Sequence, residues 1–145
     1  MALGTTAEAG TLGPQERRDV VRVCSKVCRE HGVPLLVGAG SNDTAGTVGA
    51  IEELEQVDGV AGALVVVPYY TRPSEAGVVA LFEHVAERTT PPLVLYNVPY
   101  RTGRYLGWES IVSLAEHPGI VGIKQAVGTV DTDTSRRPSA VVTRR

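Results

Sequence analysis

The chain has 145 residues, of which 43% are hydrophobic and 21% charged, a composition typical of a single globular domain. Its formal net charge is −2 and its main body carries no basic cluster, which argues against a nucleic-acid partner. There is no apolar stretch of about 18 residues and no leader-like amino terminus, so we expect a cytoplasmic protein without a membrane span.

Helix and strand signals alternate along the chain. A first helix is expected from Pro14 to Gly32, because proline suits the first helical turn and glycine suits a helix end. Later helices are expected to start near residues 41–43 and 74, where Ser, Asn or Asp side chains can cap a helix. Another is expected near residue 108, where an apolar pattern of helical period begins. Apolar runs predict strands at 35–38, 63–67, 93–96 and 120–124.

The predicted strands end near residues 38, 67, 96 and 124, at intervals of 29, 29 and 28 residues. Such a period predicts repeated βα units and a parallel sheet whose strands all end on one rim. A closed barrel has eight strands and typically about 250 residues. We therefore expect a partial (β/α)8 TIM barrel over residues 1–128, with about four full βα units and the tip of an earlier strand before Gly4. Residues 129–145 lose the apolar pattern and are expected to form a disordered tail.

The two cysteines, Cys24 and Cys28, lie four positions apart on the first predicted helix. This spacing fits either half of a metal or redox site or two small side chains on one apolar helix face. No cluster of partner ligands lies nearby, so we expect core side chains. The three histidines share no spacing that suggests a metal site.

Lys124 and Tyr96 each end an apolar strand, on the rim where barrel enzymes keep their chemistry. A lysine in an apolar site is a candidate nucleophile, because desolvation disfavours its ammonium form and the free amine attacks carbonyls. A phenol close to the resulting imine would move protons. The residues alone leave open a solvated lysine and a core tyrosine.

Three loops add polar groups to the same rim. Thr5 and Thr6, with free backbone N–H groups, would hold a carboxylate, and Arg101 would bind one with two hydrogen bonds. Tyr69 and Tyr70 follow the second predicted strand. Taken singly, these residues also fit a polar loop, a surface arginine and simple aromatic packing.

Five segments occur together in a known order: GTTAEAGTL (4–12), VGAGSNDT (37–44), VVPYYTRPSEAG (66–77), YNVPYRTG (96–103) and GIKQA (122–126). In these motifs the chain resembles the dihydrodipicolinate synthase family, within the pyruvate-dependent class I aldolase superfamily that includes N-acetylneuraminate lyase. The resemblance covers about residues 3–128. It implies a Schiff base between pyruvate and Lys124, with Tyr96 as the proton relay.

The resemblance also assigns the remaining residues. Thr5 would link Tyr96 to Tyr70, and Tyr70 would enter the active site of a neighbouring subunit. Thr6 would contact the pyruvate carboxylate, and Arg101 would receive aspartate 4-semialdehyde.

The implied function is a lyase that condenses pyruvate with aspartate 4-semialdehyde to give 4-hydroxy-tetrahydrodipicolinate, in lysine and diaminopimelate biosynthesis. It implies no metal or organic cofactor, because the lysine imine is the electron sink, and it implies a homo-oligomer. One alternative is another pyruvate-dependent aldolase, such as an N-acetylneuraminate or keto-sugar-acid lyase, against which Arg101 argues. Another is a non-catalytic fragment.

Two departures from the family pattern carry expectations. Ala7 stands where the family usually has glycine, and its methyl group would strain the loop if that position needs a positive φ. The first strand and helix and everything after the lysine strand have no counterpart in these residues. We therefore expect a truncated barrel with open sheet edges, and poor solubility or self-association of the chain.

Overall fold

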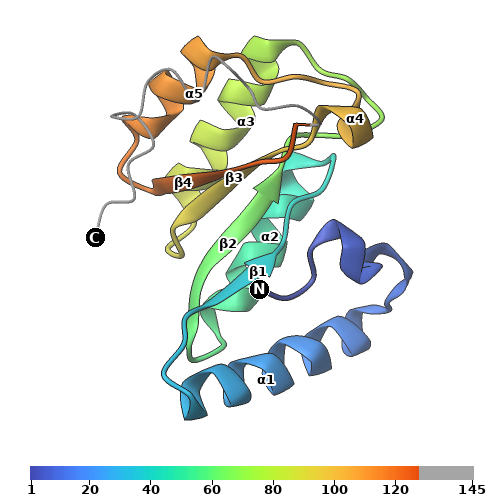
Figure 1. Ribbon diagram of the computed structural model, residues 1–145, viewed down its shortest axis with the longest axis vertical. Coiled ribbons are helices and arrows are strands. Elements are labelled where there is room, and N and C mark those ends of the chain that lie inside the picture. The colour runs from blue at the N-terminus through green and yellow to red at the C-terminus, as the bar shows by residue number, and fades with distance from the viewer. Residues whose placement is uncertain (128–145) are drawn as a thin grey trace.

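The computed structural model describes residues 1–127 and shows a four-stranded parallel sheet with the strand order β1-β2-β3-β4 (Figure 1). The strands are β1 (Leu35–Gly38), β2 (Val60–Val66), β3 (Leu93–Asn97) and β4 (Ile120–Gln125). The helices are α1 (Pro14–Glu30), α2 (Thr44–Glu55), α3 (Glu75–Arg88), α4 (Pro99–Thr102) and α5 (Trp108–Ala115). Two short 3₁₀ turns, η1 (Thr5–Ala7) and η2 (Ala9–Thr11), precede α1.

The order of the strands in the sheet follows their order in the chain. Consecutive parallel strands need helical crossovers, and α2, α3 and α5 provide them. The expected earlier strand tip is also present. Ala2 forms a parallel bridge with Val37, and its backbone pairs with Leu36 and Gly38 through two hydrogen bonds of 2.9 Å.

The two faces of the sheet differ in their cover. Helices α1, α2 and α5 pack on β1, β2 and β4, and the main core lies beneath them, with Phe82 of α3 fully buried. The other face carries a smaller cluster built on Leu64, Val66, Tyr96 and Val98. A parallel sheet with helices on one side and a narrow apolar inner side is an arc of a βα barrel, which confirms the predicted fold class.

Several predicted boundaries were wrong by a few residues. Strand β2 begins at Val60, three residues early, because the left-handed Gly59 (φ 85°) turns the chain directly into pairing with Leu35. Its last predicted residue, Val67, follows the strand but still donates to the Tyr96 carbonyl at 3.0 Å. The short helix α4, whose residues were expected to form a loop, begins at Pro99, which suits a first helical position.

The predicted core role of the cysteines is confirmed, since the partly buried Cys24 and Cys28 pack against the main core. In the part of the chain that the structure describes, no helix is long and apolar enough to cross a membrane. The expected tail, residues 129–145, lies outside the described residues.

Candidate active site

Lys124 and Tyr96 are direct neighbours at the carboxyl ends of β4 and β3. The parallel register pairs the two residues, and the Nζ of Lys124 lies 4.1 Å from the centroid of the Tyr96 ring. Tyr96 is only 4% exposed, whereas Lys124 is partly buried. The predicted proximity of the two residues is therefore confirmed, and the contact has the geometry of a cation–π interaction.

A register shift in β4 brings this pair into line. Leu93 pairs with Ile120, but Val94 pairs with Gly122, so β4 holds one extra residue at this point. A bulge of this kind re-aims the side chains that follow it. The shift aligns Lys124 with Tyr96, whose ring belongs to the inner apolar cluster of the sheet.

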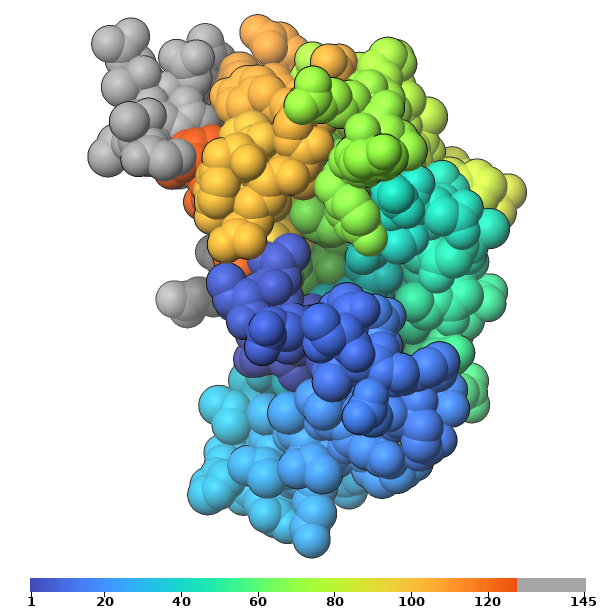
Figure 2. Space-filling model, turned by 90° about the vertical axis from the view of Figure 1, so that its right-hand side faces the viewer, coloured from blue at the N-terminus to red at the C-terminus, as the bar shows by residue number. Residues whose placement is uncertain are grey.

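Thr5 reaches the same place from the other end of the sheet. Its Oγ1 lies 3.2 Å from the Tyr96 hydroxyl, within hydrogen-bond distance, and either oxygen can donate. The amino-terminal segment, dark blue in Figure 2, contacts α1 and approaches the gold segment around residue 100. The Ala2 bridge to β1 fixes where the amino-terminal segment begins. The 3.2 Å contact is the predicted link between Thr5 and Tyr96.

The conformation of this loop corrects the expectation about Ala7. Ala7 lies in η1, where its N–H donates to the Gly4 carbonyl at 2.9 Å, and it has no positive φ. The left-handed residue is Glu8, with φ 52°. A non-glycine residue enters that region at a cost of about 1–2 kcal/mol, so the strain sits one residue later than predicted. Thr6 is exposed beside Thr5 in the same turn.

Tyr70 and Arg101 do not join this cluster. Tyr70 is 88% exposed at φ 67°, and no hydrogen bond links it to Thr5 within residues 1–127. The exposed Arg101 lies in α4, where its Nε donates to the Tyr100 hydroxyl at 3.3 Å. That hydrogen bond raises the pKa of Arg101 above its ordinary value, with smaller contributions from the charges of Tyr100 and Tyr96.

Two side chains that the sequence did not single out hold the segment after Arg101. The fully buried Asn97 donates from Nδ2 to the Leu106 carbonyl at 3.3 Å. Glu75 accepts hydrogen bonds of 2.7 Å from the Gly107 N–H and the Ser110 hydroxyl. The Ser110 bond, followed by the Gly107 bond, holds the pKa of Glu75 below its ordinary value of 4.5. The only sequence signal was the position of Asn97 directly after Tyr96.

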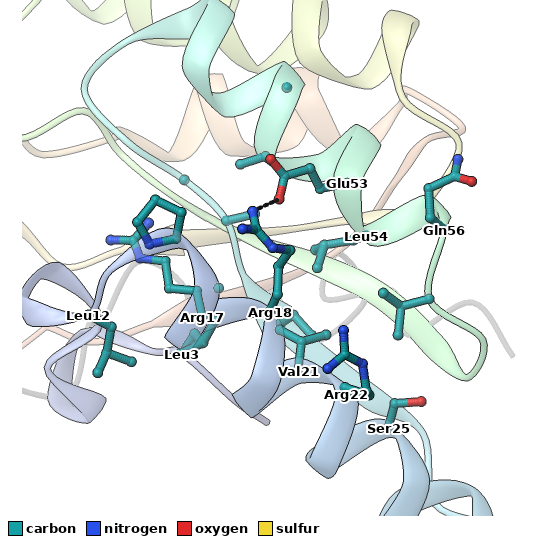
Figure 3. Close-up of a pocket in the computed structure, with 18 of the residues that line it drawn as sticks. Leu3, Leu12, Arg17, Arg18, Val21, Arg22, Ser25, Glu53, Leu54 and Gln56 are labelled. Atoms are coloured by element: carbon teal, nitrogen blue, oxygen red, sulfur yellow. Dashed lines mark ion pairs between the residues drawn. The ribbon is translucent and has the colours of Figure 1, made fainter.

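A large groove lies away from these residues. A groove of about 1500 Å³ runs between α1 and α2, and its walls include the ion pair between Arg18 and Glu53 at 3.8 Å (Figure 3). Neither Lys124 nor Tyr96 lines it. The chemistry of the strand ends therefore belongs to the inner rim and not to this groove. In residues 1–127 no group of three His, Cys, Asp or Glu residues could hold a metal ion.

Comparisons with known proteins identify the family of the chain. The model of the dihydrodipicolinate synthetase family matches residues 1–141. The 4-hydroxy-tetrahydrodipicolinate synthase of Ligilactobacillus salivarius is 42% identical over 125 residues, which cover 86% of this chain and 43% of that protein. The enzyme of the same name from Methanococcoides burtonii is 42% identical over 128 residues, 88% of this chain and 43% of that protein.

Solved structures give the same result. The 4-hydroxy-tetrahydrodipicolinate synthase of Methylacidiphilum fumariolicum SolV superposes with a TM-score of 0.87 at 37% identity, over 97% of this chain and 46% of that one. The chloride-inhibited dihydrodipicolinate synthase of Acinetobacter baumannii, complexed with pyruvate, gives 0.86 at 37% identity, over 92% and 45%. The chain thus spans less than half the length of these relatives.

Proposed function

Because the chain belongs to the dihydrodipicolinate synthetase family, we propose that it carries the Schiff-base lysine and the proton relay of a 4-hydroxy-tetrahydrodipicolinate synthase. One observation carries the proposal. The Lys124 amine lies 4.1 Å from the centre of the Tyr96 ring, and the Thr5 hydroxyl lies 3.2 Å from the Tyr96 hydroxyl. The pyruvate complex of the Acinetobacter baumannii relative supports pyruvate as the first substrate.

In the proposed first step, the Lys124 amine attacks the keto carbon of pyruvate and forms a C–N bond, the carbonyl π bond breaks, and a proton passes from the nitrogen to the oxygen to give the carbinolamine. The carbinolamine then loses its hydroxyl as water, and the Tyr96 phenol supplies the proton that this departure needs. The nitrogen then releases a proton, and the Thr5 hydroxyl, 3.2 Å from the phenol oxygen, would pass it to the Tyr96 phenolate and restore the phenol. No redox partner is consumed, because the step exchanges a carbonyl oxygen for an imine nitrogen.

The second substrate and the oligomer follow from the family. We assign the pyruvate carboxylate to Thr6 and aspartate 4-semialdehyde to Arg101, whose exposed guanidinium suits a carboxylate. Tyr70 is assigned to the site of a neighbouring subunit in a homo-oligomer, and its high exposure in the single chain is compatible with that role.

Imine formation tests the proposal, because it needs only the amine and pyruvate. The chain has two lysines, Lys124 and Lys26, and Lys26 lies exposed on α1 near Glu30. After incubation with pyruvate and reduction with borohydride, peptide mass spectrometry should find the adduct on Lys124 and not on Lys26. Lys124→Arg should abolish it and Lys26→Arg should not. Equal labelling of both lysines in folded protein would refute the proposal.

A further inference from the structure

The loop of residues 3–12, which carries Thr5, is held in a strained conformation. Leu3 and Glu8 both have φ 52°, in the left-handed region that non-glycine residues rarely adopt. Within the loop, the Ala7 N–H donates to the Gly4 carbonyl, and Thr11 donates to the Glu8 carbonyl through its N–H and its hydroxyl. These turns close the loop on itself but do not fix it against the sheet. Strained backbone persists only where surrounding contacts over-determine it.

A guanidinium from α1 fixes this loop from outside. Arg17 donates from Nε and Nη2 to the Ala9 carbonyl, at 3.0 Å and 2.7 Å. Arg17 itself is well anchored, because its N–H donates to the Gly13 carbonyl at the start of α1. Figure 3 shows its side chain reaching from α1 towards the segment of Leu12.

The Arg17 guanidinium has no role in a salt bridge within residues 1–127, where no carboxylate lies within ion-pair distance of it. The next residue, Arg18, does pair with a carboxylate, Glu53 on α2. The two neighbouring arginines therefore differ in what they hold. Arg18 ties α1 to α2, whereas Arg17 ties α1 to the loop.

We propose that Arg17 is a positioning residue that places the Thr5 hydroxyl on the Tyr96 phenol by holding the Ala9 carbonyl against α1. Its catalytic meaning rests on the proposed function, but the placement of the loop does not. The loop contacts the site through Thr5 and contacts α1 through Ala9, four residues later. Loss of the Arg17 contact frees the far end of the loop and lets the Glu8 strain relax, which moves Thr5 away from Tyr96.

Hydrogen exchange tests the placement without any substrate. In Arg17→Gln, amide protection of residues 1–12 should fall about tenfold, the loss expected for one or two net hydrogen bonds. Protection of α3 should not change. Arg18→Gln is the matched control and should leave residues 1–12 unchanged. Unaltered protection in Arg17→Gln, or an equal fall in α3, would overturn the proposal.

A second variant tests the strain. Glu8→Gly accepts φ 52° without steric cost, so it should restore part of the lost protection in the Arg17→Gln background. If Glu8→Gly restored no protection, Arg17 would not act by holding the strained Glu8 conformation in place.

The trapping reaction then reads the consequence for chemistry. Arg17→Gln should slow adduct formation on Lys124 several-fold at saturating pyruvate, with an unchanged half-saturating concentration, because the relay and not pyruvate binding is disturbed. An unchanged rate with a loosened loop would refute the link to Tyr96. A wild-type chain without any adduct would count against the proposed function, while the exchange experiment would still decide the placement.

Discussion

The candidate site has a strand-borne half and a loop-borne half, and they are held by different forces. Tyr96 and Lys124 are placed by backbone pairing of β3 with β4 over a buried core. Thr5 and Arg101 lie on segments held by a few side-chain contacts, from Arg17 in one case and from Asn97 and Glu75 in the other. Backbone pairing is shared among many hydrogen bonds, whereas a single side-chain contact fails as a unit. The loop-borne half should therefore loosen first.

The largest expected effect lies under the strand-borne half. Leu95 is 1% exposed on β3, between Val65 and Ile123 in the sheet. Leu95→Ala should lower the free energy of unfolding by about 2–5 kcal/mol, because it leaves a cavity in the main core. Urea denaturation measures the loss. Tyr100→Ala, at a site 68% exposed, should cost less than about 0.5 kcal/mol. Similar costs for both variants would contradict a strand-borne half held by its core.

The next effect concerns the hydrogen bond that joins the two halves. Tyr96→Phe keeps the ring beside Lys124 but removes the hydroxyl that meets Thr5. Pyruvate trapping on Lys124 should slow by about 10²-fold, the lower range for a lost proton-transfer group. Unfolding should change by no more than about 1.5 kcal/mol, the worth of one hydrogen bond. Tyr69→Phe, a partly exposed control, should leave trapping unchanged. A Tyr96→Phe rate equal to wild type would remove the phenol from the mechanism.

The sequence predicted the strand-borne half well because its signals are local. Apolar runs at a regular interval determine where β3 and β4 end, and parallel pairing then brings Tyr96 and Lys124 to one rim. The one-residue shift in β4 that aligns the two was not predictable, because it depends on the packing of both strands.

The loop-borne half was predicted less fully, because its contacts join residues that no period relates. Nothing in the sequence shows that Arg17 meets the Ala9 carbonyl, or that Glu75 meets Gly107 and Ser110. The glycine pattern of the family directed attention to Ala7, whereas the closed loop places the positive φ on Glu8. Such details arise only when the tertiary structure forms.

A smaller effect concerns the hydrogen bonds of Glu75 to Gly107 and Ser110, which hold the segment after Arg101, and it depends on pH. Hydrogen bonds from Ser110 and Gly107 depress the pKa of Glu75 in the folded chain. Its stabilisation is therefore present above the ordinary carboxyl pKa of 4.5 and is lost as the pH falls through the lower folded pKa.

Glu75→Gln should lower the free energy of unfolding at pH 7 by about 1 kcal/mol and flatten its decline in acid. Urea denaturation between neutral and acidic pH measures both changes. Glu83→Gln, on the exposed side of the same helix, should behave as wild type. An acid decline as steep in Glu75→Gln as in wild type would place the titration on another group.

The smallest effect tests which residue of the loop carries the strain. Ala7 has no positive φ, so Ala7→Gly relieves nothing and adds backbone freedom to the unfolded chain. It should destabilise the loop by about 0.5 kcal/mol, whereas Glu8→Gly should stabilise it. Hydrogen exchange of residues 1–12 distinguishes the two signs. A gain in protection from Ala7→Gly would move the strained position back to the glycine of the family pattern. The sign of each change in amide protection would then show whether the loop reaches Tyr96 in a relaxed conformation or only because Arg17 holds it there.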